Sequence, residues 1–196
     1  AERLRAALFR SYGPDDLREA IVRLGIATGD TVMLHSAFDP KFGFQGSSAD
    51  VVDTFIDVLG PEGHLLMVSL PYRTSSLDYL KDLRVFDVRR TPSAMGLVSE
   101  FFRRRPDVVR SLHPTHPILV RGPRADWFVA GHEQCIHPCG DGSPFARLAE
   151  AGGKVVFYDV SVEYLTFFHY LEHLVSPQLP FPLYSEEVFD VPVVDA

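Results

Sequence analysis

A strand, a helix and a second strand follow one another between residues 30 and 70, and this order strongly constrains the fold. Asp30–Ser36 is rich in β-branched and apolar residues, as is typical of a buried strand. Ser47 and Asp50 resemble a capping box with a shorter acid and predict a helix over 48–59. His64–Leu70 is a second apolar strand. Two strands joined in this way are expected to pair in parallel through a right-handed crossover.

The rest of the chain also alternates helices and strands, which indicates an α/β domain. We predict an N-terminal pair of helices over 2–12 and 14–25, a helix over Ala94–Arg104 capped by Thr91-Pro92-Ser93, a strand over Pro117–Arg121, a helix from Ser143-Pro144 to Gly152-Gly153, a central-type strand over Lys154–Asp159, an amphipathic helix over Glu163–Val175 and an edge-like strand over Val188–Val194. A single domain over residues 1–196 is expected from the length.

Composition narrows the function classes. The chain is 46% hydrophobic and 23% charged, with a formal net charge of −7 and mixed signs along its length, which argues against a nucleic-acid partner. No apolar stretch approaches the roughly 20 residues that cross a bilayer, and the first residues lack a secretory apolar block. We therefore expect a cytoplasmic protein with no membrane partner. Cys135 and Cys139 lie too close together to predict a disulfide framework.

The carboxyl ends of parallel strands are the usual ligand-binding edge of an α/β sheet. His35 and Ser36 end the first strand of the crossover unit, and the loop after Leu70 follows the second. These residues are therefore candidates for a binding site.

The stretch Arg110-Ser-Leu-His-Pro-Thr-His-Pro117 contains His113 in a loop fixed by prolines. A fixed backbone suits a general base that must meet a substrate amine at hydrogen-bond distance. Histidine is equally useful as a buried structural residue, so the residues alone leave both roles open.

The helix predicted over 163–175 contains Thr166, His169, Glu172 and His173 at helical spacing. These side chains could cluster into a site. They could also be an ordinary polar stripe beside an apolar core, since such stripes are common on amphipathic helices.

The segment His132-Glu-Gln-Cys-Ile-His-Pro-Cys139 has residue types that bind zinc. A tetrahedral zinc site usually needs a second pair of ligands elsewhere, and no second Cys-x-x-Cys occurs. We therefore predict no metal, with a zinc-dependent hydrolase as an open alternative. The chain has no Walker or Rossmann glycine loop and no Gly-x-Ser-x-Gly elbow, which sets those enzyme classes aside.

Seven motifs in order resemble the aminoglycoside 3-N-acetyltransferase family over roughly residues 14 to 175. They are Gly29-Asp-Thr-Val-Met-Leu-His-Ser36, Leu59-Gly-Pro-Glu-Gly63, Thr91-Pro-Ser-Ala-Met-Gly96, Arg110-Ser-Leu-His-Pro114, Gly142-Ser-Pro-Phe-Ala-Arg-Leu148, Gly153-Lys-Val155 and Thr166-Phe-Phe-His-Tyr-Leu-Glu-His173. The resemblance implies a three-layer α/β/α fold with a mostly parallel or mixed sheet, distinct from the GNAT fold. It also implies direct transfer of the acetyl group of acetyl-CoA to an amine of an aminoglycoside or related amino sugar.

The resemblance also implies roles for residues. His113 is then the catalytic base, and His169 and Glu172 orient it or the acceptor. The expected acetyl-CoA side consists of His35, Ser36, Ala37, Phe38, Thr91, Pro92, Ser93 and Thr166. Backbone amides at a helix start, where Ser93 is predicted, suit a pyrophosphate or a thioester oxyanion.

The chain also departs from the family pattern. Asp159 and Ser161 stand where the family often has glycines, and His116 stands where a small residue is common. The chain also ends earlier than the family usually does. The acceptor therefore stays open between an aminoglycoside and the amine of a sugar nucleotide or glycan precursor. A non-catalytic module that binds CoA or a sugar is a further alternative, and a homodimer is one option for the assembly.

Overall fold

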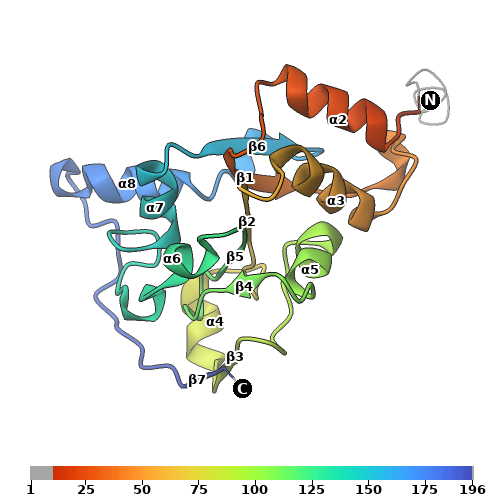
Figure 1. The fold of residues 1–196 in the computed structure, drawn as a ribbon. Helices are drawn as coiled ribbons and strands as arrows, with labels where there is room; N and C mark the ends of the chain where they lie inside the picture. Colours follow the sequence, from red (N-terminus) through yellow and green to blue (C-terminus); the bar gives the residue numbers. More distant parts are fainter. Residues whose placement is uncertain (1–10, 196) are drawn as a thin grey trace, which may run out of the picture.

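The computed structural model describes residues 11–195 and has helices packed on both faces of a central sheet (Figure 1). The helices are α2 (Pro14–Arg23), α3 (Ser48–Leu59), α4 (Ser76–Asp82), α5 (Leu97–Arg103), α6 (Ala125–Val129), α7 (Pro144–Glu150) and α8 (Phe168–Val175). The strands are β1 (Thr31–Ser36), β2 (His64–Val68), β3 (Phe86–Asp87), β4 (Val109–Arg110), β5 (Ile118–Arg121), β6 (Lys154–Tyr158) and β7 (Val193–Val194). Short 3₁₀ turns lie at Pro40–Phe42, His132–Gln134, Val162–Tyr164 and Ser176–Gln178.

The central sheet has the order β4-β5-β2-β1-β6. β1 pairs in parallel with β2 and with β6, whereas β5 is antiparallel to β2 and β4. The predicted parallel pairing across the β1–α3–β2 unit is confirmed, and so is the mixed sheet. The prediction of a central position for the strand at Lys154 is wrong, because β6 lies at one edge of this sheet among the described residues.

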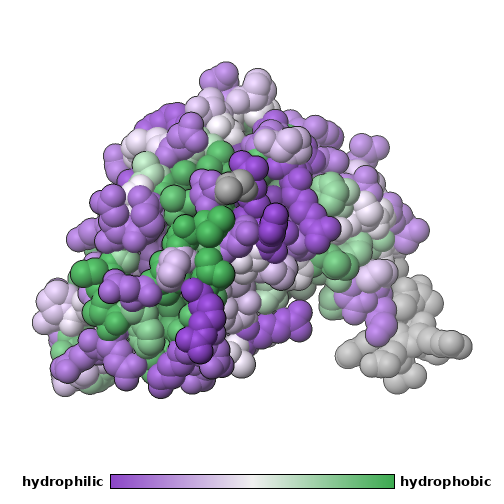
Figure 2. Space-filling model, turned by 90° about the horizontal axis from the view of Figure 1, so that it is seen from below, coloured by the Kyte–Doolittle hydropathy of each residue, from purple (hydrophilic) through white to green (hydrophobic). Residues whose placement is uncertain are grey.

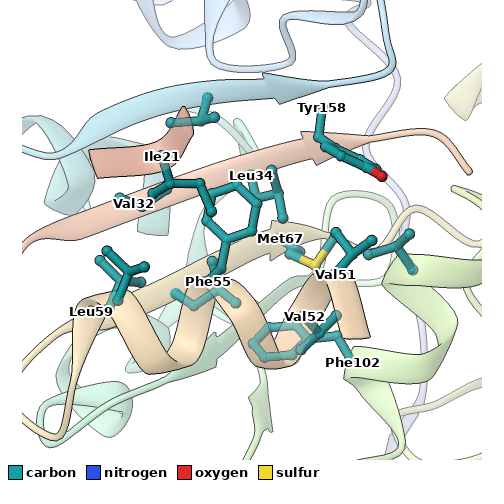
Figure 3. Packing of buried hydrophobic residues seen from close by; sticks show 14 of the residues in the cluster. Ile21, Val32, Leu34, Val51, Val52, Phe55, Leu59, Met67, Phe102 and Tyr158 are labelled. Atoms are coloured by element: carbon teal, nitrogen blue, oxygen red, sulfur yellow. The ribbon is translucent and has the colours of Figure 1, made fainter. Parts of the chain in front are cut away.

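Successive side chains of a strand point to opposite faces of the sheet, so a hydrophobic core lies on each face. On one face, Leu34 and Met67 pack with α2, α3 and α5 around Phe55 and Phe102 (Figure 3). On the other face, Met33 and neighbouring strand residues pack against α6 and α7. Figure 1 shows the same separation of the helices. The three-layer α/β/α prediction is confirmed.

The helix predicted over 48–59 has the predicted bounds. Ser47 Oγ accepts a hydrogen bond from Asp50 N, and the Asp50 carboxylate accepts one from Ser47 N at 2.7 Å. This reciprocal bonding satisfies two amide donors at the start of the helix.

Two predicted helices have the wrong start. The helix predicted from Ala94 begins at Leu97, after Gly96, whose φ of 109° ends the preceding loop. The helix predicted from Glu163 begins at Phe168 after a separate 3₁₀ turn, so Thr166 precedes it. In both cases the helical spacing of apolar residues extends back into the loop before the helix. Spacing alone therefore does not show where the helix begins.

The ends of the chain also differ from expectation. Of the helix predicted over 2–12, residues 2–10 lie outside the described residues, and Tyr12 forms a parallel bridge with Phe44. The edge-like strand predicted over 188–194 is reduced to β7, which pairs in parallel with β3. The polar segment 73–84 and the segment after Arg121 contain α4 and α6, which were not predicted.

The surface is mainly polar, with a band of apolar side chains across one face (Figure 2). No helix within residues 11–195 combines the length and apolar character that a membrane span requires.

Candidate functional site

The carboxyl ends of β1, β2 and β6 open into a cavity of about 1230 Å³. This is large for a single small ligand, since sites for drug-sized molecules usually measure about 300–1,000 Å³. Six of the residues proposed from the sequence line it, namely His35, Ser36, Ala37, Phe38, Thr166 and His169.

His35 lies at the end of β1 with its ring stacked on Phe157, the ring centroids being 5.2 Å apart. Its side chain is buried, and no polar group of residues 11–195 contacts its Nε2. Burial lowers the pKa of His35 to about 4, so the ring is neutral at pH 7. The buried Ser36 Oγ is equally without a partner among the described residues. Buried polar atoms are normally hydrogen-bonded, which indicates that a ligand or water meets these two.

The loop after β2 supplies a positive charge. Arg73 lines the cavity, and its Nε donates to the Ala94 carbonyl at 3.3 Å. A guanidinium suits the phosphate groups of an anionic ligand. Tyr72 and Met95 complete this side. The loop after Leu70 was predicted to lie at this edge of the sheet, but these three residues were not singled out.

His169 and Glu172 form a close pair on α8. The distance from His169 Nδ1 to Glu172 Oε2 is 2.7 Å, at the i, i+3 spacing that brings helix side chains together. An imidazole whose Nδ1 is held by a carboxylate has a fixed tautomer and orientation, with Nε2 free to exchange a proton. Because His169 lines the cavity, that proton exchange can take place with a ligand bound there.

His113 has a different environment from the one expected. It is buried outside the cavity lining, and its Nδ1 accepts from the amide and hydroxyl of Thr115 at 3.2 and 3.1 Å. Its Nε2 therefore donates to the Cys135 carbonyl at 3.1 Å. Burial lowers the pKa of His113 to about 4. Neither ring nitrogen of His113 contacts Glu172, whose carboxylate is paired with His169.

His116 connects the two regions. Its Nδ1 lies 2.9 Å from Thr115 Oγ1, and its ring is edge-on to that of His169 with centroids 6.3 Å apart. Burial first, and then the neighbouring histidines, lower the pKa of His116 to about 3. A row of side chains thus leads from His113 through Thr115 and His116 to His169. From the sequence, His116 is recognisable only as a departure from the family pattern, and nothing in its spacing places it in this row.

Thr91, Pro92 and Ser93 do not line the cavity. Thr91 Oγ1 accepts from Asp87 N at 3.1 Å. Ser93 is not the N-cap of α5: its Oγ donates to Ser99 Oγ at 2.7 Å, because the Ser99 hydroxyl donates to the Val68 carbonyl. These contacts fix the loop that leads into α5. A direct role of Thr91, Pro92 and Ser93 in cofactor binding therefore has no geometric support.

The zinc alternative has no support in the described part of the chain, where no three His, Cys, Asp or Glu side chains converge on one point. The fully buried His132 instead bonds Ser111 Oγ at 2.8 Å and the Pro138 carbonyl at 2.7 Å. The His-Cys segment therefore packs behind His113, with the His113 and His132 ring centroids 4.8 Å apart.

Comparison with known proteins gives consistent results. The profile of the family described as "Aminoglycoside 3-N-acetyltransferase" matches residues 33–195. "Aminoglycoside N(3)-acetyltransferase III" of a Salmonella species is 29% identical over 168 residues, covering 80% of this chain and 58% of the relative. The solved structure "AAC-IIIb binary with CoASH" matches with a TM-score of 0.72 and 29% identity, over 83% of this chain and 65% of that one.

A second structure, "AAC-VIa bound to Sisomicin", matches with a TM-score of 0.71 and 29% identity, over 83% of this chain and 65% of that one. This chain thus spans about three fifths of the length of its relatives. It belongs to the aminoglycoside 3-N-acetyltransferase family, so the family predicted from the seven motifs is confirmed.

Proposed function

Because the chain belongs to the aminoglycoside 3-N-acetyltransferase family, we propose that it transfers the acetyl group of acetyl-CoA to an amine of an amino sugar. The observation that carries this proposal is the His169–Glu172 pair at a cavity on the carboxyl edge of the sheet. The bond from the acetyl carbon to the amine nitrogen forms as the bond from that carbon to the CoA sulfur breaks. The amine loses a proton, and the leaving thiolate gains one.

We assign the proton transfer to His169. It lines the cavity, and the carboxylate of Glu172 holds its Nδ1, which stabilises the imidazolium that forms when Nε2 takes the proton. His113 has both ring nitrogens engaged by neighbours and lies outside the lining. Its predicted role as base is therefore replaced by a positioning role through Thr115 and His116.

The residues present fit acetyl-CoA in two respects. The unpartnered polar atoms of His35 and Ser36 can hydrogen-bond amide or thioester groups, and Arg73 can pair with a phosphate. Acetyl-CoA supplies an activated thioester carbonyl when bound. The family structure described as a binary complex with CoASH supports this choice of cosubstrate, and the one described as bound to sisomicin supports an aminoglycoside as acceptor.

The test is a thiol-release assay with acetyl-CoA over a panel of aminoglycosides and nucleotide-linked amino sugars. We expect His169→Gln to lower kcat by about 10²–10⁴, the usual contribution of a general base, while the Kd for acetyl-CoA changes less than about threefold. Glu172→Gln keeps the shape and removes the charge, so we expect a smaller loss of kcat.

His113→Asn is the matched comparison, with thermal melting measured in parallel because His113 is buried. Under this proposal, the folded His113→Asn protein retains more activity than His169→Gln. The reverse order would return the role of base to His113. Binding of acetyl-CoA without turnover of any acceptor would instead favour a non-catalytic binding module.

A further inference from the structure

Asp159 directly follows β6 and lines the same cavity as His169. Its backbone φ is 52°, and it is the only non-glycine residue with a positive φ among residues 11–195. Aspartate and asparagine tolerate this left-handed region better than most residues, but it is still uncommon. Residues in such strained backbone conformations are concentrated at functional sites. The conformation of Asp159 therefore suggests that its carboxylate has a role besides forming the turn.

The Asp159 carboxylate has no cationic partner within the described chain. Its one hydrogen bond is from Tyr12 Oη, at 3.5 Å, and Tyr12 Oη is also 3.1 Å from Tyr158 Oη. Burial, together with the nearby carboxylate of Asp39, raises the pKa of Asp159. Both effects disfavour the anion, and a cationic ligand placed beside it would relieve them.

The cavity is therefore divided by charge. β6 and β2 flank β1 in the sheet, so the loop with Asp159 and the loop with Arg73 border opposite sides of the β1 end. Glu163 lines the cavity on the Asp159 side. Between them is His35, with its unpartnered Nε2, which marks the cavity as a ligand site independently of charge. The Arg73 side suits an anionic cosubstrate, and the Asp159 side suits a cationic one.

We infer that Asp159 is a specificity-determining residue that binds a second, protonated ammonium group of the acceptor. The reacting amine must be unprotonated at His169, so it cannot be the group held as a cation. An acceptor with several amines supplies both groups. A nucleotide-linked amino sugar has a diphosphate instead, which the carboxylates of Asp159 and Glu163 repel. This inference rests on the proposed function and selects an aminoglycoside-like polyamine over the sugar nucleotide.

Asp159→Asn is the appropriate change, because asparagine tolerates the positive φ and lacks the charge. We expect it to raise the KM and the calorimetric Kd for sisomicin by about 5- to 20-fold, with kcat less affected, since an ammonium held away from the reacting centre contributes mainly to binding. The values for glucosamine, which has one amine, should change less than about twofold. Added salt should reduce the difference between wild type and variant for sisomicin.

Glu62→Gln is the control, since Glu62 is an exposed acid just before β2 and so at the opposite edge of the sheet. It removes the same charge and should leave both acceptors unchanged. Asp159→Gly, which relieves the backbone strain, should match Asp159→Asn in sisomicin affinity and exceed wild type in thermal stability.

The outcomes separate this inference from the proposed function. If wild type acetylates sisomicin and Asp159→Asn leaves its KM and Kd unchanged, or changes sisomicin and glucosamine equally, the role of Asp159 is overturned alone. If wild type prefers the nucleotide-linked amino sugar, the role of Asp159 is overturned although transfer is retained. If wild type neither binds nor acetylates any amine, both are overturned.

Discussion

Acid should destabilise this fold through histidines that are buried as neutral rings, and His35→Phe isolates one of them. His35 is 8% exposed, stacks on Phe157 and has a pKa lowered to about 4 by burial. Phenylalanine keeps the stacked ring and removes a buried nitrogen that has no partner within residues 11–195. At pH 7 the free energy of unfolding should therefore stay within about 1 kcal/mol of wild type.

The loss of unfolding free energy in acid follows from the protons that His35 binds in the folded and unfolded chains. In the unfolded chain His35 takes up a proton below about pH 6.5, whereas in the folded chain it does so only near pH 4. Stability is therefore complete above pH 6.5 and falls as the pH is lowered toward 4. A difference of about 2.5 pH units corresponds to about 3.4 kcal/mol in all, of which about 2 kcal/mol is lost by pH 5.

The measurement is urea unfolding at pH 7 and pH 5, followed by circular dichroism. The loss of unfolding free energy between the two pH values should be smaller in His35→Phe than in wild type by about 2 kcal/mol. Val32→Ala, a cavity-forming change on the same strand, is the control: it lowers stability at both pH values but leaves the loss on acidification unchanged. An equal loss in His35→Phe and wild type would refute the burial of His35 as a neutral ring.

Two further changes test the packing that positions the site. Gly122 has a φ of 139°, and a Cβ there would lie 2.6 Å from the Gly63 carbonyl oxygen, so Gly122→Ala should cost about 2 kcal/mol or more in urea unfolding; a loss below about 0.5 kcal/mol would contradict this contact. Arg110→Leu should lower the free energy of unfolding by about 3 kcal/mol in the same assay. The buried guanidinium donates to the carbonyls of Val88 and Ser69 at 3.0 and 2.9 Å, and leucine leaves these carbonyls unpaired. Wild-type stability of the variant would show that water replaces these donors.

The parts of the fold that were predictable from sequence are those with local causes. The helix over 48–59 combines its own cap, amphipathic period and terminating glycine, so its bounds needed no tertiary information. The parallel pairing of β1 with β2 follows from the length of their connection. The edge position of β6 has no such local cause. The residues of β6 are largely apolar because helices cover both faces of the sheet. A strand at the edge and a strand in the centre therefore have the same apolar pattern.

The helix starts at Leu97 and Phe168 were mispredicted for a related reason. Ser93 is a good capping residue by type, but its hydroxyl meets Ser99, a contact that depends on how the loop folds back. Thr166 continues the polar spacing of α8, although it lies before the helix. Residue type and spacing therefore indicated the correct segments of the chain. The residue at which each helix begins was decided by tertiary contacts.

The candidate site shows the same difference between features with local causes and features that depend on tertiary contacts. A proline-fixed histidine is a recognisable sequence signal, but so is a histidine three residues from a glutamate on one helix, and only the second signal describes a contact. His169 and Glu172 meet because of helix geometry, whatever the rest of the fold does. Their position in the cavity depends on where α8 packs, which the sequence did not reveal. The row from His113 through Thr115 and His116 ends at His169, so both signals lead to one end of the sheet. Local pairing thus identifies the group that can exchange a proton, and burial identifies those that hold the surrounding structure in place.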